Sequence, residues 1–328
     1  MTCCLMSIIT VLAYILVPIS IFKIFLKLTT GWDRSPTCLV GKTAIITGAN
    51  SGIGFYTAQD FAKRGARVIL ACRNRQKAEE AKFKIIEATG NPNVVVRIVD
   101  LSSLASVRAF AKEINETETR LDILVNNAGL GGMEHQLTAD GLSLIMQSNH
   151  FGPFLLTHLL TELLKKCAPS RVVNVSSKAA DYGKLDLNNL NGPPDSYFTK
   201  SRDYANTKLC NILFTAELAR RLKGSGVETY VIQPGLVKTE ILQHLPLINR
   251  LAVQALASIT HKNGEEGAQT SIYASVSKDV IGKSGEYFGE CKKWRMPSAA
   301  KNKELARKLW EKSEELVQLT HQERQLLQ

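Results

Sequence analysis

The sequence has no C-x-x-C pair, and its seven cysteines are an odd number scattered through apolar stretches. This pattern excludes a disulfide framework and the common zinc spacings, so we predict free thiols, a reducing compartment and no metal site. Cys3 and Cys4 lie at the start of the chain, where acylation is an alternative to plain thiols. The chain also lacks low-complexity stretches and repeats at solenoid spacing, which excludes repeat architectures.

Sequence features of a nucleic-acid-binding module are missing as well. There is no aromatic string of the RNA-recognition type and no basic region followed by heptads. The net charge is nevertheless +11. A generally basic surface is the ordinary explanation, and attraction to anionic lipid headgroups or to a phosphate-rich cofactor are the functional ones. Nucleic acid is therefore not an expected partner.

Charge is absent between Met1 and Phe22. The apolar run continues to Leu28, broken only by Lys23 and Lys27, which is long enough for a transmembrane helix of about 20 residues. A cleaved signal peptide would carry its basic residues before the apolar run, whereas here they follow it. We expect an uncleaved single-pass anchor, with the rest of the chain on the cytosolic side by the positive-inside rule and the endoplasmic reticulum as the membrane.

After this segment, short apolar runs alternate with helical patterns. The expected strands are Thr43–Thr47, Arg67–Cys72, Val94–Val99, Leu121–Val125, Arg171–Val175, Val227–Ile232 and Gly285–Phe288. The expected helices are Phe55–Lys63, Gln76–Thr89, Ser103–Asn115, Leu137–Leu164 with an interruption at Gly152-Pro153, and Tyr204–Leu222. Apolar strands that alternate with helices predict an α/β fold, a doubly wound, Rossmann-type, mostly parallel sheet covered on both faces.

The pattern divides the chain into four expected parts. These are a membrane anchor over 1–28, a linker over 29–40, a single α/β domain over 41–300 and a basic amphipathic helix over 301–328. For the last helix, packing on the domain is favoured over a place on the membrane surface. Within the domain, the apolar stretch Leu236–Thr260 either covers the core or forms an apolar mouth that faces the bilayer.

A glycine-rich turn follows the first expected strand. It contains Gly48, Asn50, Ser51, Gly52, Ile53 and Gly54 in the pattern G-x-x-x-G-x-G. Glycines let the backbone turn tightly and approach a pyrophosphate, which then lies at a helix N-terminus. Isolated glycines also occur in ordinary tight turns, but their place between a strand and a helix favours dinucleotide binding.

The end of the second expected strand indicates which dinucleotide binds. In NAD-binding sheets an acidic residue about 20 positions after the turn binds the ribose 2′-hydroxyl. No acid occurs between Val68 and Arg75, where Arg73 and Arg75 stand instead. An arginine attracts a 2′-phosphate that a carboxylate would repel, so NADP(H) is favoured over the alternative of arginines that are merely solvated.

Two further strand ends are placed to touch a cofactor. Asp100 follows the third expected strand, where its carboxylate could accept a hydrogen bond from adenine, although it could equally cap the next helix. Asn127, Ala128 and Gly129 follow the fourth, where backbone and small side chains can lie against the dinucleotide.

Tyr204 is the only one of eight tyrosines with a lysine four residues further on, Lys208. On a helix the two share a face, and a nearby ammonium, together with the positive nicotinamide ring of an oxidised cofactor, lowers the pKa of a phenol. Such a pair alone would be an ordinary exposed pair, but Ser176-Ser177 and Asn149 converge on the same strand ends. A serine there can bind the substrate oxygen as charge develops, and an asparagine can hold a water that supplies protons.

In order, these motifs and Pro234-Gly235 resemble those of the short-chain dehydrogenase/reductase family over residues 41–294. The stretches GARVILACRN and LCNILFTAELARRLKGSGV resemble, more narrowly, the retinol dehydrogenase 11–14 group. The resemblance implies a catalytic tetrad of Asn149, Ser177, Tyr204 and Lys208. It also implies that Lys208 binds the nicotinamide ribose and that Pro234 and Thr239 lie on the nicotinamide side.

The implied activity is the reversible, NADPH-dependent reduction of a lipophilic carbonyl, most simply retinal to retinol, with Tyr204 as the acid/base. A steroid or a fatty aldehyde or ketone stays open as substrate, because Ala205-Asn206-Thr207 stand where that group usually has Cys-His-Ser. A non-enzymatic cofactor-binding membrane protein is the alternative of another class. The expected partners are a lipophilic small molecule, a membrane and, through the helices around Asn149 and Tyr204, a second copy of the chain.

Overall fold

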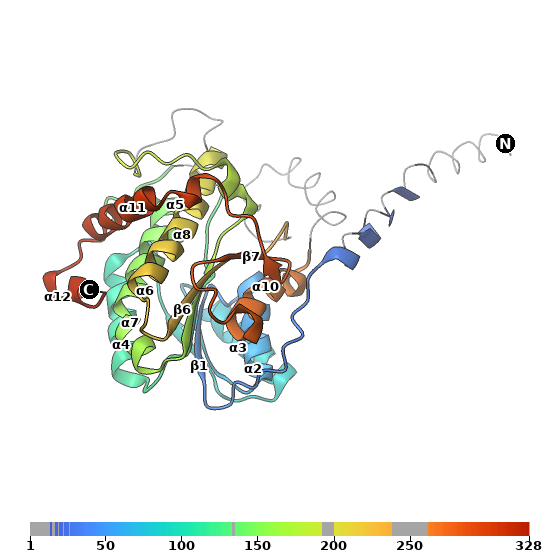
Figure 1. Cartoon of the computed structure of the whole chain (residues 1–328). Helices are drawn as coiled ribbons and strands as arrows, with labels where there is room; N and C mark the ends of the chain where they lie inside the picture. The colour runs from blue at the N-terminus through green and yellow to red at the C-terminus, as the bar shows by residue number, and fades with distance from the viewer. Residues whose placement is uncertain are drawn as a thin grey trace.

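The computed structural model describes residues 14, 17, 18, 20, 21, 23–25, 27–132, 135–191, 200–237 and 262–327. Its centre is an eight-stranded sheet in the order β3-β2-β1-β4-β5-β6-β7-β8 (Figure 1). Neighbouring strands run parallel except β7 and β8, which are antiparallel. The doubly wound, mostly parallel sheet predicted from the sequence is confirmed.

The strands are β1 (Thr43–Thr47), β2 (Arg67–Cys72), β3 (Val94–Ile98), β4 (Ile123–Asn126), β5 (Ser170–Val175), β6 (Val227–Gln233), β7 (Tyr287–Gly289) and β8 (Lys292–Lys293). The helices are α2 (Gly52–Lys63), α3 (Arg75–Thr89), α4 (Leu104–Thr117), α5 (Leu144–Met146), η1 (Gln147–Phe151), α6 (Gly152–Leu159), α7 (Thr161–Lys166), η2 (Lys178–Tyr182), α8 (Lys200–Arg221), α10 (Gly264–Val276), η5 (Lys278–Val280), η6 (Ala299–Lys301), α11 (Lys303–Leu316) and α12 (His321–Gln325).

Helices cover both faces of the sheet because successive strand residues point to opposite sides. In β1, Ile45 belongs to the core under α4, α6 and α8, whereas Ala44 and Ile46 belong to the core under α2, α3 and α10. All five β1 residues are buried, as is typical of a parallel strand in the middle of a sheet. This arrangement places every parallel strand's carboxyl end at one edge of the sheet.

The helix expected over Leu137–Leu164 begins later and breaks elsewhere. Leu137 pairs with Ser143 as an isolated bridge, and the helical path starts at Leu144. Gly152-Pro153 do not interrupt it, because they lie in the first turn of α6, where proline is tolerated. The break falls at Leu160, between α6 and α7. The short strand β8 was not predicted.

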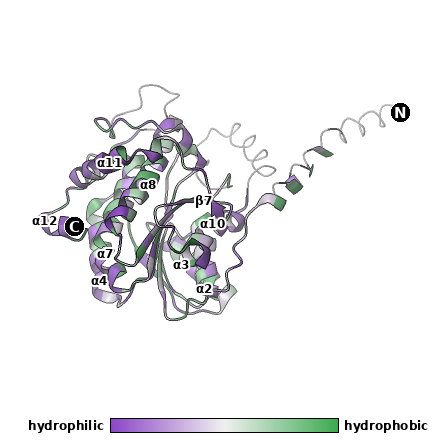
Figure 2. Cartoon of the chain, in the orientation of Figure 1, coloured by the Kyte–Doolittle hydropathy of each residue, from purple (hydrophilic) through white to green (hydrophobic). Residues whose placement is uncertain are grey.

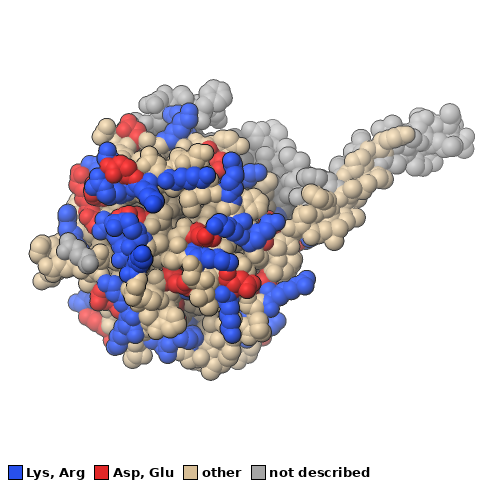
Figure 3. Space-filling view, in the orientation of Figure 1, with Lys and Arg blue, Asp and Glu red and all other residues tan. Residues whose placement is uncertain are grey.

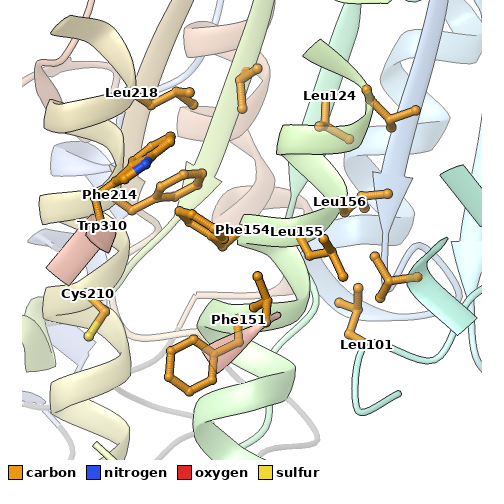
Figure 4. Packing of buried hydrophobic residues seen from close by; sticks show 14 of the residues in the cluster. Leu101, Leu124, Phe151, Phe154, Leu155, Leu156, Cys210, Phe214, Leu218 and Trp310 are labelled. Carbon is orange, nitrogen blue, oxygen red and sulfur yellow. The ribbon is translucent and has the colours of Figure 1, made fainter. Parts of the chain in front are cut away.

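The C-terminal stretch forms two helices, α11 and α12, rather than the single one expected. As predicted, it packs on the domain: α11 lies against α8, and Trp310 of α11 is 2% exposed. The Trp310 ring centroid lies 4.8 Å from that of Phe154 and 5.8 Å from that of Phe214 (Figure 4). Because α11 covers this side of α8, a second copy that docked here would contact α11. The homodimer stays a prediction.

The described residues before Thr30 have helical backbone and project from the domain (Figures 1 and 2). The apolar side chains of Ile24 and Phe25 are exposed. Among the described residues, no helix combines the length and apolar character needed to cross a bilayer. Residues 1–13, 15, 16, 19, 22 and 26 of the expected anchor lie outside that part. The expected linker is held on the domain, since Arg64 pairs with Asp33 at 2.9 Å and Thr37 Oγ1 donates to Val276 O at 2.9 Å.

Candidate active site

A cleft of about 710 Å³ opens at the carboxyl ends of the parallel strands. The residues that line it come from the ends of β1 to β6 and from α3, η1 and α8. Of the expected site residues, those that line it are Gly48, Asn50, Ser51, Gly52, Ile53, Arg73, Asp100, Asn127, Ala128, Gly129, Ser177, Tyr204, Lys208 and Pro234. This is the edge at which ligands of doubly wound sheets bind.

The glycine-rich turn has the backbone that the pattern requires. Gly48 and Gly52 have φ angles of 66° and 55°, in the left-handed region that glycine adopts without a steric cost. Gly54 meets a different requirement, since a Cβ there would lie 2.5 Å from Asn127 Nδ2. That Nδ2 donates to Thr47 O at 2.8 Å, so Asn127 braces the turn as well as lining the cleft.

The N-terminus of α2 fits the diphosphate part of a dinucleotide. Ser51 is the N-cap residue, but its side chain makes no capping hydrogen bond. The first backbone N–H groups of a helix lack partners within the helix and carry a partial positive charge. Because Asn50, Ser51 and Ile53 line the cleft here, this helix end suits an anion.

Positive charge gathers at the end of β2. Arg73 and Lys77 are exposed and line the cleft, whereas Arg75 does not. The first turn of α3 holds no acidic residue, although a helix N-terminus usually favours one. Sequence reasoning missed Lys77, whose signal was its position four residues after Arg73. On the face shown in Figure 3, basic residues are spread among acidic ones instead of forming one stripe.

Asp100 is not the cap of α4. Ser103 is the N-cap, and its side chain accepts a hydrogen bond from Ser106 N. The Oδ1 atom of Asp100 accepts hydrogen bonds from Ser102 N at 2.9 Å and Ser102 Oγ at 2.6 Å. This leaves the carboxylate in the wall of the cleft, where it is the only acidic lining residue in the described part of the chain.

Ser177, Tyr204 and Lys208 come together at the end of β5. The Ser177 side chain hydrogen-bonds Tyr204 and also accepts from Ala179 N at 3.2 Å. Lys208 Nζ lies 5.4 Å from the Tyr204 ring centroid and donates to Val175 O at 3.1 Å. Ser176 Oγ donates to Lys208 O at 2.7 Å and is buried. Of the two serines, Ser177 is therefore the one whose side chain contacts Tyr204.

Burial sets the proton affinities of this group. It raises the pKa of Tyr204 to about 12, against the opposing effect of the Ser177 hydrogen bond. It lowers the pKa of Lys208 to about 8. In the chain alone desolvation is the larger effect on this phenol, and the lowering expected from Lys208 together with an oxidised cofactor stays a prediction. At neutral pH the phenol keeps its proton, which is the form that can donate it.

Asn149 lies in η1, a π-helical turn of a kind often found at functional sites. Its Oδ1 accepts from Leu130 N at 2.7 Å, and its Nδ2 donates to Leu130 O at 2.8 Å and Thr207 Oγ1 at 3.0 Å. The Thr207 hydroxyl in turn donates to Tyr204 O at 2.8 Å. Asn149 does not line the cleft among the described residues; its amide joins the loop after β4 to α8 instead.

Comparison with known proteins settles the family. Residues 42–247 match the model of the short chain dehydrogenase family. The chain belongs to that family. Mouse retinol dehydrogenase 14 is 45% identical over 294 residues, which cover 86% of the chain and 87% of the relative. Human dehydrogenase/reductase SDR family member 13 is 44% identical over 292 residues, which cover 87% of the chain and 77% of that relative.

Solved structures agree with this membership. An uncharacterised protein of Mycobacterium paratuberculosis has a TM-score of 0.71 at 33% identity, covering 88% of the chain and 98% of its own. The Pseudomonas aeruginosa RhlG/NADP active-site complex has a TM-score of 0.60 at 27% identity, covering 76% and 95%. As a short-chain dehydrogenase with retinol dehydrogenases among its relatives, the chain is an oxidoreductase that acts on CH–OH groups.

Two expected positions of this short-chain dehydrogenase remain. Pro234 lines the cleft directly after β6, next to Gly235 with a φ angle of 86°. Thr239 lies outside the described residues. Thr207 was named from the sequence only as a departure from the related group, and its bond to Asn149 was not predicted.

Proposed function

We propose that the chain is a membrane-anchored, NADP(H)-dependent reductase of lipophilic carbonyls, most simply of retinal to retinol. One observation carries the proposal. A single cleft has Ser177, Tyr204 and Lys208 at one end and Arg73 with Lys77 at the other. The first end suits proton transfer to a carbonyl, and the second suits a phosphate on the adenosine ribose.

The roles follow from the contacts. When bound, NADP(H) supplies or accepts the hydride. Tyr204, held protonated by burial, gives its proton to the substrate oxygen, and Ser177 binds that oxygen while charge develops on it. Lys208, with its pKa lowered to about 8, exchanges protons near neutral pH and can reprotonate the phenol. Asn149 acts through Leu130 and Thr207, by fixing the loop and the helix that frame the site.

The preference for NADP(H) rests on the rim of the cleft. Arg73 and Lys77 line the cleft at the end of β2, where they would attract a 2′-phosphate, and the end of β2 carries no carboxylate that would repel it. The RhlG complex supports the choice, since that protein, 27% identical to this one, was solved with NADP.

The choice of substrate rests on the relatives. Several proteins that are 44–45% identical to the chain are named retinol dehydrogenases. The departures after Tyr204 have structural roles here: Asn206 Oδ1 accepts from Lys184 N at 2.7 Å, and Thr207 binds Asn149. Since Asn206 shapes the loop that follows η2, a steroid or a fatty aldehyde is the second candidate substrate.

The membrane part of the proposal rests on the apolar N-terminal run. We place the anchor at 1–28, the linker at 29–40, the catalytic domain at 41–300 and the C-terminal helical part at 301–328, with the domain on the cytosolic side of the endoplasmic reticulum. Protease added to intact microsomes should degrade the domain. Protection of the domain would refute this topology.

The test of function is NADPH consumption by membranes that carry the protein, with all-trans-retinal, steroid ketones and fatty aldehydes as substrates. Tyr204→Phe is the control, which should bind NADPH without turnover. Retinal turnover that is lost in Tyr204→Phe supports the full proposal. Turnover of another carbonyl but not of retinal would keep the mechanism and replace retinal as the proposed substrate. Turnover that persists in Tyr204→Phe would remove the tyrosine from the mechanism. No turnover at all would favour a cofactor-binding protein.

A further inference from the structure

The turn between β7 and β8 has an unusual backbone. Its two residues, Glu290 and Cys291, both have a φ angle of 52°. Two-residue hairpin turns with two positive φ angles are normally built from asparagine, aspartate and glycine. Other residues hold this conformation only when their surroundings impose it, and such positions gather at functional sites.

The surroundings of Glu290 supply that constraint through its carboxylate. Lys262 Nζ donates to Glu290 Oε1 at 2.7 Å and to Oε2 at 2.6 Å, and Gly31 N donates to Oε2 at 2.9 Å. The Lys262 and Glu290 side chains are only 13% and 19% exposed. Charge-assisted hydrogen bonds of this kind are stronger than those of a solvated surface pair.

Through Lys262 the carboxylate is connected to the wall of the cleft. Lys262 pairs with Val237 as a parallel bridge, and its N–H donates to Leu236 O at 2.7 Å. Gly235 packs on the ion pair itself, since a Cβ there would lie 3.2 Å from Lys262 Cε and 3.4 Å from Glu290 Oε1. Gly235, Leu236 and Val237 all line the cleft. The Lys262–Glu290 pair therefore supports this wall from behind.

Through Gly31 the same carboxylate is connected to the N-terminal segment. Gly31 packs so closely that a Cβ there would lie 2.2 Å from Glu290 O. On either side of it, Lys27 pairs with Glu266, and Asp33 N donates to Gln269 Oε1 at 3.1 Å, both on α10. The N-terminal segment and the wall of the cleft are thus both connected to the Glu290 carboxylate.

We propose that Glu290 is a positioning residue that holds the Gly235–Val237 wall against the nicotinamide half of the cofactor, and that the N-terminal segment completes this support through Gly31. The inference rests on the proposed function, since it takes the cleft to be an NADP(H) site. This role explains why a glutamate occupies a position with a positive φ angle: its carboxylate is needed there to bind Lys262 and Gly31.

The test is Glu290→Asn in the full-length chain in detergent micelles, with NADPH and NADH affinities measured by fluorescence titration. Asparagine tolerates a positive φ angle, and this gain offsets the stability lost when its short, neutral side chain no longer pairs with Lys262, so the thermal unfolding midpoint should change little. We expect both cofactors to bind about three- to tenfold more weakly, in equal measure, because they share the nicotinamide half.

Cys291→Gly is the matched control. It relieves the other positive φ angle and keeps the backbone bond from Cys291 N to Thr270 Oγ1, so cofactor affinity should not change. Gly31→Ala should weaken both cofactors in the same direction as Glu290→Asn. In the double variant the two losses should not add, because each acts through the same carboxylate.

The outcomes separate the two proposals. Wild-type protein that binds neither cofactor would overturn the proposed function. Wild-type binding with unchanged affinity in Glu290→Asn would overturn the role of Glu290 alone. If Glu290→Asn lowers both the cofactor affinities and the thermal unfolding midpoint, Glu290 stabilises the fold in general and does not position the wall, which would also overturn the inference. If Glu290→Asn does not accumulate as folded protein, Glu290→Gln is measured by the same criteria.

Discussion

His150 should make the folded protein sensitive to mild acid. It follows Asn149 in η1, is 1% exposed, and lies among Phe151, Phe154 and Phe214. Its Nε2 lies 2.9 Å from Ser313 Oγ of α11. Burial lowers its pKa from 6.5 to about 4, because the surrounding aromatic groups cannot solvate a charged imidazole.

The sign of the effect follows from proton linkage. Between pH 6.5 and about 4 the unfolded chain binds a proton at His150 and the folded chain does not. The stability that this group contributes is therefore present above pH 6.5 and is lost as the pH falls toward 4. With these two pKa values, the free energy of unfolding should drop by about 2 kcal/mol between about pH 7.5 and pH 5.

The perturbation is His150→Phe, which keeps an aromatic ring but cannot titrate. Urea unfolding of both proteins in micelles, followed by tryptophan fluorescence at the two pH values, gives the comparison. Wild type should lose about 2 kcal/mol more than the variant on acidification. His158, whose pKa burial also lowers, is present in both proteins and cancels. Substitution of exposed His321 by glutamine is the control. Parallel losses in wild type and His150→Phe would refute the reasoning.

Three further predictions concern the cleft. Arg73→Ala should weaken NADPH about tenfold or more and NADH little, with Lys77→Ala showing a smaller effect of the same kind, and equal losses for the two cofactors would contradict a 2′-phosphate site. Thr207→Val should lower kcat about five- to tenfold, because Asn149 Nδ2 loses its acceptor, and Thr207→Ser should restore it; a failure of serine to rescue would mean that shape and not the hydroxyl matters. Gly54→Ala should abolish measurable cofactor binding, since its Cβ would lie 2.5 Å from Asn127 Nδ2, and unchanged titrations would show that the turn can shift.

The sheet could be predicted because its signals are local. Buried parallel strands are continuous apolar runs, and the seven that were predicted agree with β1 to β7 to within about two residues at most ends. The glycine-rich turn and Tyr204-x-x-x-Lys208 were equally readable, since their spacing reflects the geometry of a strand–helix turn and of one helix face.

The errors arise where tertiary contacts decide. Residues 137–143 were predicted to begin a helix, but a bridge between Leu137 and Ser143 and the left-handed Gly141 place them in a turn. The raised pKa of Tyr204 in the chain alone comes from burial, which a lysine four residues away does not indicate. The contacts of Glu290 with Gly31 and Lys262 join distant parts of the chain, and no sequence spacing indicates them.

The position of α11 has a consequence for synthesis of the protein. Every described residue of the cleft precedes Lys262, yet the apolar surface formed by Phe154, Phe214 and Leu218 is covered by Trp310 of α11 (Figure 4). A growing chain therefore completes its cleft before it can close this surface. A truncated product that ends before Lys303 would keep every described residue of the cleft but expose the side chains of Phe154, Phe214 and Leu218. Such a product should therefore aggregate or be degraded, although its catalytic residues are intact.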